Sequence, residues 1–248
     1  MFDLTGRVAL VTGAGRGIGA VIAATLAKRG AAVIVNDLNR EHAMASAGVI
    51  RDAGGRALES AFDVSNLSAC RDSIASAEAK IGGVDILVNN AGGSPGGVFP
   101  KPFIETPHEL WADYMDMNLE GVFNCTRVVV EGMVERGHGR LIEVSSDAGR
   151  VGHVGSSIYG AAKAGAEGFM RTLSKELGPK GVTANSVVLG LIDTVPREFL
   201  EGLDTTKLYW MRRIGNAEDV AAGVLYLVSD EAGWVNGHSL VINGGGTR

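Results

Sequence analysis

Short apolar runs that alternate with segments of helical period constrain the fold of this chain more than any other feature. Runs short enough for buried parallel strands cover residues 7–12, 32–37, 84–89, 140–145, 182–189 and 239–243, and another precedes Asp63. Helical segments separate these runs, at residues 18–29, 40–52, 67–81, 108–136, 157–177 and 219–229. The alternation predicts an α/β fold, a doubly wound parallel sheet of about seven strands with helices on both faces.

Composition and charge narrow the domain count and the partners. No shift in composition divides the 248 residues, so we expect a single domain over residues 1–248. The net charge is −5 and no basic run exceeds Arg212 and Arg213, which argues against nucleic acid. The apolar segments are shorter than the roughly 20 residues that span a membrane, and Met1 opens onto a strand rather than a signal peptide. We therefore expect a cytoplasmic protein that does not bind membranes.

The two cysteines, Cys70 and Cys125, fall inside predicted helices far apart in the sequence. This placement fits buried thiols in a reducing compartment better than a disulfide. No metal ligands are assigned.

Two irregular segments, residues 92–105 and 191–208, follow the carboxyl ends of predicted strands. Ligands of open α/β sheets bind at those ends, so we expect both segments to line a substrate pocket. Residues 191–208 are predicted to form a lid over it.

A glycine-rich loop, TGAGRGIG at residues 12–19, links the first predicted strand to the first helix. Glycines there allow a tight turn and close approach to a pyrophosphate, whose charge the helix N-terminus stabilises. Asp37 follows at the end of the second strand, where a carboxylate accepts hydrogen bonds from ribose hydroxyls. It would repel a 2′-phosphate by about 4 kcal/mol at about 4 Å and an effective dielectric near 20. The pattern favours NAD over NADP.

Arg16, inside the loop, and Arg40 leave NADP open. Either guanidinium is long enough to reach a 2′-phosphate and offset the repulsion from Asp37. The alternative is that both are solvated surface charges.

Tyr159 and Lys163 lie one helical turn apart in a segment that we expect Ser157 to cap. A free tyrosine has a pKa of about 10, and a lysine ammonium within about 4–6 Å lowers it by one to three units. The pair is therefore suited to proton transfer near neutral pH, unless it is only a surface pair.

The combined motifs are specific. They are the loop at 12–19, Asp63 with Val64, NNAG at 89–92, Asn118 in MNLEGVF, Ser146, Tyr159 with Lys163, Gly190 with Thr194, and NGGG at 243–246. In this order and spacing they resemble the short-chain dehydrogenase/reductase family, in its single-domain branch, over essentially the whole chain. The resemblance implies a Rossmann-type sheet, NAD(P)-dependent oxidoreduction and, commonly, a homotetramer.

The resemblance also implies catalytic roles. Tyr159 would be the general acid/base and Lys163 would lower its pKa and bind the nicotinamide ribose. Ser146 would hold the substrate oxygen, with Ser145 as the competing candidate, and Asn118 would keep a water in place for a proton relay.

For cofactor binding, the resemblance places groups of residues along the dinucleotide. The implied set is Gly13, Arg16, Gly17 and Ile18 near the phosphates, Asp37 at the ribose, Asp63 and Val64 at the adenine, Asn90, Ala91 and Gly92 along the adenosine half, and Tyr159, Lys163, Gly190, Ile192 and Thr194 toward the nicotinamide. Asn89 is expected to brace the central strands.

Two positions depart from the family pattern. Leu189 precedes Gly190 where proline is usual, and Asn243 stands where aspartate is usual. The first is expected to change the mobility of the lid or its nicotinamide contacts. The second removes a charge to which the sequence assigns no role.

Three functions follow from these patterns. The leading hypothesis is an NAD-dependent oxidoreductase that interconverts a secondary alcohol and a ketone. The alternative enzyme is an NADPH-dependent 3-oxoacyl thioester reductase, against which Asp37 argues. The non-enzyme alternative is a nucleotide-binding redox sensor, which the complete set of catalytic residues disfavours.

Overall fold

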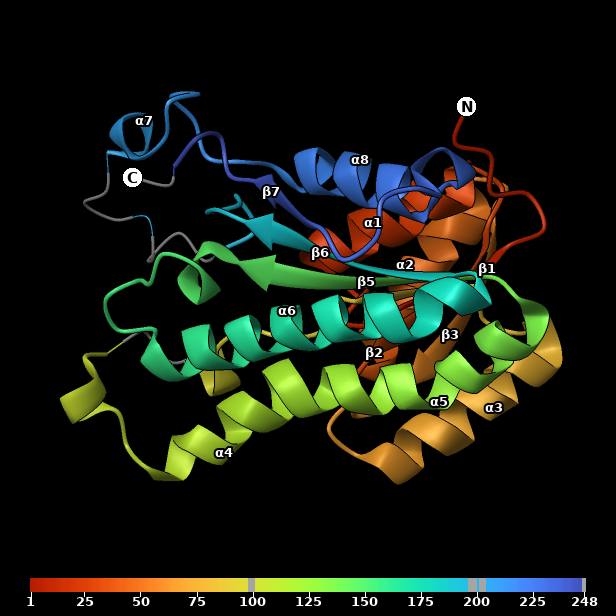
Figure 1. Cartoon of the computed structure of the whole chain (residues 1–248), viewed down its shortest axis with the longest axis horizontal. Coiled ribbons are helices and arrows are strands. Elements are labelled where there is room, and N and C mark those ends of the chain that lie inside the picture. The colour runs from red at the N-terminus through yellow and green to blue at the C-terminus, as the bar shows by residue number, and fades with distance from the viewer. Residues whose placement is uncertain (98–100, 196–199, 201–203, 247–248) are drawn as a thin grey trace.

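The computed structural model describes residues 1–97, 101–195, 200 and 204–246. Its centre is a parallel sheet of seven strands, ordered β3-β2-β1-β4-β5-β6-β7 (Figure 1). The strands are β1 (Val8–Val11), β2 (Ala32–Asp37), β3 (Arg56–Ala61), β4 (Ile86–Asn89), β5 (Gly139–Ser146), β6 (Val182–Leu189) and β7 (Ser239–Ile242). The predicted doubly wound Rossmann-type sheet is confirmed.

Helices cover both faces of the sheet, which explains why its strands read as almost continuous apolar runs. One layer holds α1 (Gly17–Lys28), α2 (Arg40–Asp52) and α8 (Ala217–Val228), and the other holds α3 (Leu67–Ile81), α5 (Gly121–Arg136) and α6 (Ser157–Leu177) (Figure 1). The short helix α4 (Glu109–Met115) leads into α5 beside α6, whereas α7 (Thr205–Leu208) lies apart from both layers (Figure 1). Within the described residues, no helix is both long and apolar enough to cross a bilayer.

Alternating side chains of each strand divide the core into two parts. Val11 and Val33 pack with Ile22 of α1, while Leu10 and Leu141 pack with Met133 of α5. All six are fully buried, and burying an apolar side chain of this size contributes about 1.5–3 kcal/mol. The helices are therefore held mainly by their apolar faces.

Asparagine caps determine where three helices begin. Asn39 accepts hydrogen bonds from the backbone of Glu41 and His42 ahead of α2, and Asn66 accepts one from Ala69 ahead of α3. Asn216 begins α8 with a reciprocal capping box to Asp219. Each cap satisfies backbone donors that the helix leaves unpaired.

The start of α6 corrects one expectation. Ser157 is its first helical residue rather than its cap, and Ser156, which precedes it, makes no side-chain capping bond. Close backbone packing holds this end instead, because a Cβ on Gly160 would lie 2.6 Å from the carbonyl oxygen of Ala148. The helix that carries Tyr159 is therefore anchored to the segment following β5.

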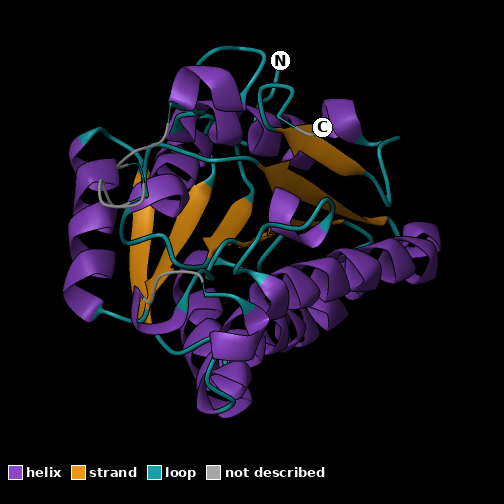
Figure 2. Cartoon of the chain, turned by 90° about the vertical axis from the view of Figure 1, so that its left-hand side faces the viewer, coloured by secondary structure: helices purple, strands orange, loops and turns teal. Residues whose placement is uncertain are grey.

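The chain reverses its winding direction between β1 and β4, and a crevice opens there at the carboxyl ends of the strands. Figure 2 looks from the side toward which the arrows of β5 and β6 point in Figure 1. Asn90, just after β4, donates its side-chain amide to the carbonyls of Thr12 (2.9 Å) and Gly13 (3.1 Å). These bonds join the ends of the two central strands.

Two further expectations concern polar core residues. The Asn89 amide donates to the Thr126 hydroxyl (3.2 Å), so Asn89 braces β4 against α5. Cys70 and Cys125 are buried free thiols, as predicted, although their Sγ atoms lie only 3.9 Å apart between α3 and α5.

Candidate active site

The proposed proton-transfer residues lie together where β5 and α6 meet. Tyr159 and Lys163 point from the first turns of α6, and Ser146 ends β5; all three line one pocket. Lys163 is buried, its Nζ lies 6.0 Å from the centre of the Tyr159 ring, and it donates to the carbonyl of Val144 (2.7 Å). The Lys163 ammonium is therefore the nearest cation to the Tyr159 ring among the residues that line this pocket.

Ser145 and Ser146 differ in what their hydroxyls contact. The Ser145 hydroxyl is buried and donates to Glu167 of α6 (2.9 Å). The Ser146 hydroxyl is partly exposed and accepts a hydrogen bond from the backbone of Ala148 (3.2 Å), which leaves its proton free for a ligand. Ser146 is thus the serine whose hydroxyl is available to a substrate oxygen.

Asn118 lies in a turn of π-helix, residues 116–120, between α4 and α5, a distortion often found at functional sites. Its side-chain amide donates to the carbonyls of Gly93 (2.9 Å) and Tyr114 (3.0 Å), and its oxygen accepts from the Gly93 backbone (2.8 Å). A Cβ on Gly92 would touch both Asn118 Oδ1 (2.7 Å) and Lys163 Nζ (3.3 Å). Asn118 therefore fixes the loop after β4 beside Lys163.

A fully buried carboxyl group lies beside Lys163 and does not line the pocket. Glu143 of β5 places Oε1 3.5 Å from Lys163 Nζ. Burial raises the pKa of Glu143 to about 7, although Lys163 opposes the shift. The group titrates in the neutral range.

The proposed cofactor residues line two hollows that share Asn90 and Gly92. The first hollow, on the β1–β2 side, is lined by Gly13, Arg16, Asp37, Asp63, Val64 and Ala91. The second is lined by Ile18, Tyr159, Lys163, Gly190, Ile192 and Thr194. Gly17 lies beside Thr194, where a Cβ would come within 3.8 Å of it. The two hollows meet at Asn90 and Gly92, and we refer to them together as the groove.

The glycine loop has the shape that a dinucleotide requires. A Cβ on Gly15 would lie 2.5 Å from the carboxylate of Asp37, and one on Gly19 would clash with the carbonyl of Gly13. The Gly15 backbone donates to Asp37 Oδ2 (3.1 Å) and that of Asn39 donates to Oδ1 (2.9 Å). Asp37 is therefore held in the groove with lone pairs left for ribose hydroxyls, and the residues fit an NAD(P) cofactor.

The two arginines that left NADP open lie in different places. Arg16 is exposed and lines the same hollow as Asp37. Arg40 lines a separate groove with Glu59. The pKa of Glu59 is lowered mainly by a backbone hydrogen bond to its carboxylate, then by Arg51, and least by Arg40. Only Arg16 of this pair lies at the groove.

The predicted lid, residues 191–208, is described in part, since residues 196–199 and 201–203 lie outside the described residues. Its first residues cross the groove, and Ile192 forms an isolated parallel bridge with Gly215. The Leu191 backbone donates to the Tyr209 hydroxyl (2.7 Å), and a Cβ on Gly190 would collide with the Tyr209 ring at 3.1 Å. Tyr209 thus fixes the beginning of the lid.

The two departures from the family pattern differ in their consequences. The Asn243 amide donates to both carboxylate oxygens of buried Asp147 (3.0 and 3.3 Å), next to Ser146. An aspartate at position 243 would instead place a second carboxylate against that of Asp147, and the two negative charges would repel each other. Leu189 is a buried strand residue in register with Ile242.

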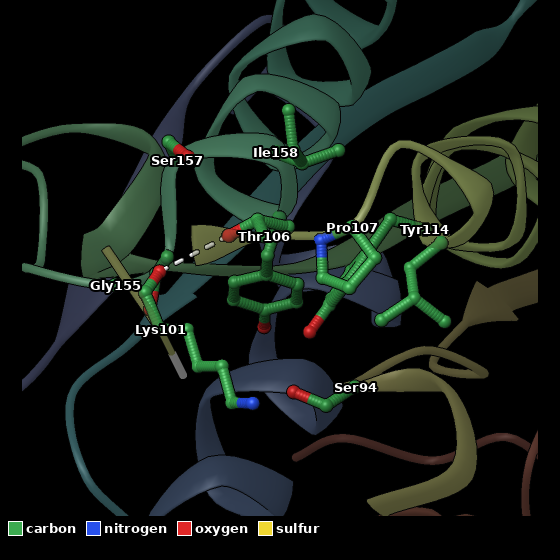
Figure 3. A pocket seen from close by; sticks show the side chains of 11 residues that line it. Ser94, Lys101, Thr106, Pro107, Tyr114, Gly155, Ser157 and Ile158 are labelled. Atoms are coloured by element: carbon green, nitrogen blue, oxygen red, sulfur yellow. Dashed lines mark hydrogen bonds between the residues drawn. The ribbon is translucent and has the colours of Figure 1, made fainter. Parts of the chain in front are cut away.

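A further pocket lies beside Tyr159 (Figure 3). Its lining is Ser94, Lys101, Thr106, Pro107, Leu110, Tyr114, Ile158 and Tyr159, with residues 155–157. The Thr106 hydroxyl donates to the carbonyl of Lys101 (3.2 Å), and in Figure 3 the Lys101 side chain extends across the pocket toward Ser94. Among the described residues that line this pocket, Lys101 is the one that carries a charge.

Sequence reasoning missed Glu143, Lys101, Tyr209 and the Asp147–Asn243 pair. A signal existed for Glu143, because a charged residue within an apolar strand must be paired or neutral once buried. The other three act across contacts between distant segments, which no local pattern reveals.

Fold and site together define a nucleotide-dependent oxidoreductase of the Rossmann type, with a tyrosine and a lysine beside its groove. Comparison with known families is consistent with this class, because the family model described as Enoyl-(Acyl carrier protein) reductase matches residues 13–247. The chain belongs to the short-chain dehydrogenase/reductase family.

Relatives include reductases of acyl thioesters. The chain is 37% identical to the 3-oxoacyl-[acyl-carrier-protein] reductase of Vibrio cholerae, covering 98% of both chains. It is 41% identical to the acetoacetyl-CoA reductase of Rhizobium meliloti, covering 96% of this chain and 98% of the relative.

Solved structures with this fold bind either nicotinamide cofactor. A gluconate 5-dehydrogenase from Burkholderia cenocepacia, in complex with NADP and tartrate, has a TM-score of 0.92 and 33% identity, covering 98% of this chain and 96% of the other. A 7α-hydroxysteroid dehydrogenase complexed with NADH has a TM-score of 0.92 and 32% identity, covering 99% and 96%.

The raised pKa of Glu143 predicts a pH-dependent difference in stability between the wild type and Glu143→Gln. A carboxyl whose pKa rises on folding stabilises the folded state below its unfolded pKa of 4.5, and this contribution is lost as the pH rises through about 7. The glutamine variant should therefore gain about 3 kcal/mol relative to wild type between pH 4 and pH 8. Urea denaturation at both pH values measures this change, and a constant difference between the two proteins would contradict it.

Proposed function

We propose that this chain is a nicotinamide-dependent reductase that converts the 3-oxo group of an acyl thioester into a secondary alcohol, and catalyses the reverse oxidation. One observation carries the proposal: Tyr159 lines both the groove that holds Ser146 and Lys163 and the separate pocket that contains Lys101. A carbonyl that enters through the second pocket would reach Tyr159 without passing Lys163, which lines only the first of the two. The names of the two thioester reductases above support this substrate class over a simple ketone.

The residues divide the proton chemistry among them. When bound, the nicotinamide supplies the hydride. Tyr159 donates its phenolic proton to the carbonyl oxygen, and Ser146, whose hydroxyl proton is free, donates a hydrogen bond to the same atom. The Lys163 ammonium stabilises the phenolate left behind. Asn118 holds the loop at Gly93 beside Lys163, from where a water would return the proton to Tyr159.

NAD(H) is the proposed cofactor. Asp37 is fixed by the backbones of Gly15 and Asn39, so it cannot turn away from a 2′-phosphate without losing both bonds. Arg16 shares the hollow but is exposed, and water screens its attraction for a phosphate. The carboxylate therefore outweighs the arginine.

Two further expectations accompany the proposal. Homotetrameric assembly is implied by the family resemblance, and α6 offers Gly165 as an exposed small residue against which a partner helix can pack closely. A redox sensor without turnover is the competing function, and it leaves the second pocket beside Tyr159 without a role.

Replacing Tyr159 tests the reaction. Tyr159→Phe removes the proton donor and keeps the ring, so kcat for reduction of acetoacetyl-CoA should fall by about 10²–10⁴-fold. Binding of NADH, followed by its fluorescence, should change little. Turnover close to wild type in this variant would rule out the proposed role of Tyr159.

Cofactor choice is tested by the ratio of kcat/KM for NADH and NADPH. The wild type should favour NADH by about tenfold or more, and Asp37→Ala should reduce that ratio to near one or reverse it. Arg40→Gln is the matched control, because Arg40 lies in the groove with Glu59, and it should leave the ratio unchanged. A wild type that prefers NADPH would refute the NAD assignment.

Lys101 should favour substrates that carry negative charge. Lys101→Gln is expected to raise KM for acetoacetyl-CoA about two- to fivefold with little change in kcat, since an exposed ion pair contributes up to about 1 kcal/mol. Lys28→Gln, at the last turn of α1, is the control. Equal KM values for the Lys101 variant and wild type would remove Lys101 from substrate binding.

A further inference from the structure

We propose that Glu143 is a positioning residue for proton transfer. Its buried carboxylate holds the Lys163 ammonium in place and determines how strongly that charge acts on Tyr159. The inference rests on the proposed function, since it assigns a role to a residue behind the same proton-transfer group. Glu143 itself touches neither the groove nor the pocket beside Tyr159, and it acts only through Lys163.

The position of Glu143 requires an explanation beyond folding. It lies in the middle of β5, fully buried, between strand partners Asn89 of β4 and Ser186 of β6. A buried carboxyl without compensation is costly, and an apolar residue would pack there at lower free energy. Glu143 Oε2 and the Ser186 hydroxyl are buried without a geometric hydrogen-bond partner among the described residues, although Ser186 lies close enough to Glu143 to lower its pKa. Lys163 is therefore the main compensation for this carboxyl.

The dependence is mutual. Lys163 is also buried, and its Nζ contacts the carbonyl of Val144 at 2.7 Å and Glu143 Oε1 at 3.5 Å. An ammonium in such a site tends to lose its proton unless an anion or several acceptors stabilise the charge. Glu143 provides that anion and fixes the direction from which Lys163 approaches Tyr159.

One other charged group faces Glu143. Glu167, one helical turn after Lys163 on α6, raises the pKa of Glu143, but its own oxygens accept from the hydroxyls of Ser145 and Ser239 (2.9 Å each). Arg171 lies 3.9 Å from it. Glu167 thus has its own partners, whereas the Glu143 carboxylate faces Lys163.

The sign of the effect on catalysis follows from electrostatics. Removing a buried negative charge lowers the pKa of every neighbouring group, so both macroscopic pKa values of the coupled Tyr159 and Lys163 pair must fall. The change applies where Glu143 is ionised, which its raised pKa confines to above about pH 7. Glu143 therefore moves the working range of the enzyme toward alkaline pH.

The test compares the full-length wild type with Glu143→Gln, which keeps the shape and removes the charge. Two pH titrations are measured: kcat/KM for the reduction of acetoacetyl-CoA, and the ultraviolet difference spectrum of the Tyr159 phenolate, obtained by subtracting the matching Tyr159→Phe protein. Both limbs of the rate profile, and the phenolate titration, should move to lower pH by on the order of 1 unit. Unchanged titrations, or a shift to higher pH, in the folded variant would overturn the proposal.

Glu167→Gln is the matched control, because it makes the same substitution at a neighbouring buried carboxyl. The limbs of its pH profile of kcat/KM should move by less than half as much as those of Glu143→Gln. An equal or larger shift would contradict a specific role of Glu143 and assign the effect to buried charge in general. Should Glu143→Gln fail to fold, Ser186→Ala provides a second variant. It withdraws the hydroxyl that faces Glu143, keeps that carboxyl neutral to higher pH, and should move the limbs in the same direction by less; no movement would contradict the proposal.

The spectroscopic titration separates this inference from the proposed function. If the phenolate titration shifts as expected while no thioester is reduced, Glu143 tunes Tyr159 and the substrate assignment is wrong. If reduction proceeds and the phenolate titration is the same in wild type and Glu143→Gln, the proposed function stands and the role of Glu143 is refuted.

Discussion

The close approach of three backbone segments at the switch between β1 and β4 is the constraint on which the rest of the structure depends. A Cβ on Gly19 would meet both the Gly13 carbonyl and the Asn90 amide, so α1 starts in direct contact with the ends of both central strands. This contact places the helix N-terminus, Asp37 and the loop after β4 around one groove. Because the groove forms from backbone positions, the catalytic side chains of α6 face a surface whose shape is already determined.

The polar groups beneath α6 form a second organising layer. Glu143, Glu167 and Lys163 lie on the buried side of this helix, while Tyr159 and the partly exposed Ser146 line the groove. The charges beside Tyr159 therefore come from β5 and α6 together, since Glu143 lies in the strand and Lys163 in the helix. Catalytic tuning of this kind needs no additional residue in contact with the ligand.

Much of this architecture could be predicted from the sequence, because apolar periodicity and glycine loops are local signals. The bounds of α2 and α3 match their predicted ranges, and the proposed catalytic and cofactor residues lie along one groove or directly beside it. Contacts between distant segments could not be predicted. The partner of Glu143, the bond from Leu191 to Tyr209 and the separation of Arg40 from Asp37 all depend on how helices pack on the sheet, and the start of α6 depends on Gly160 rather than on a serine cap.

The bond between Asn243 and Asp147 links β7 to the floor of the site. Residues 239–246 come last among the described residues, and residues 243–246 are the last of the motifs that carry the family resemblance. The Asn243 amide donates hydrogen bonds to a carboxylate one position from Ser146. Substitutions at the end of β7 should thus be able to alter the substrate range. A mutant library restricted to the residues of the groove would miss them.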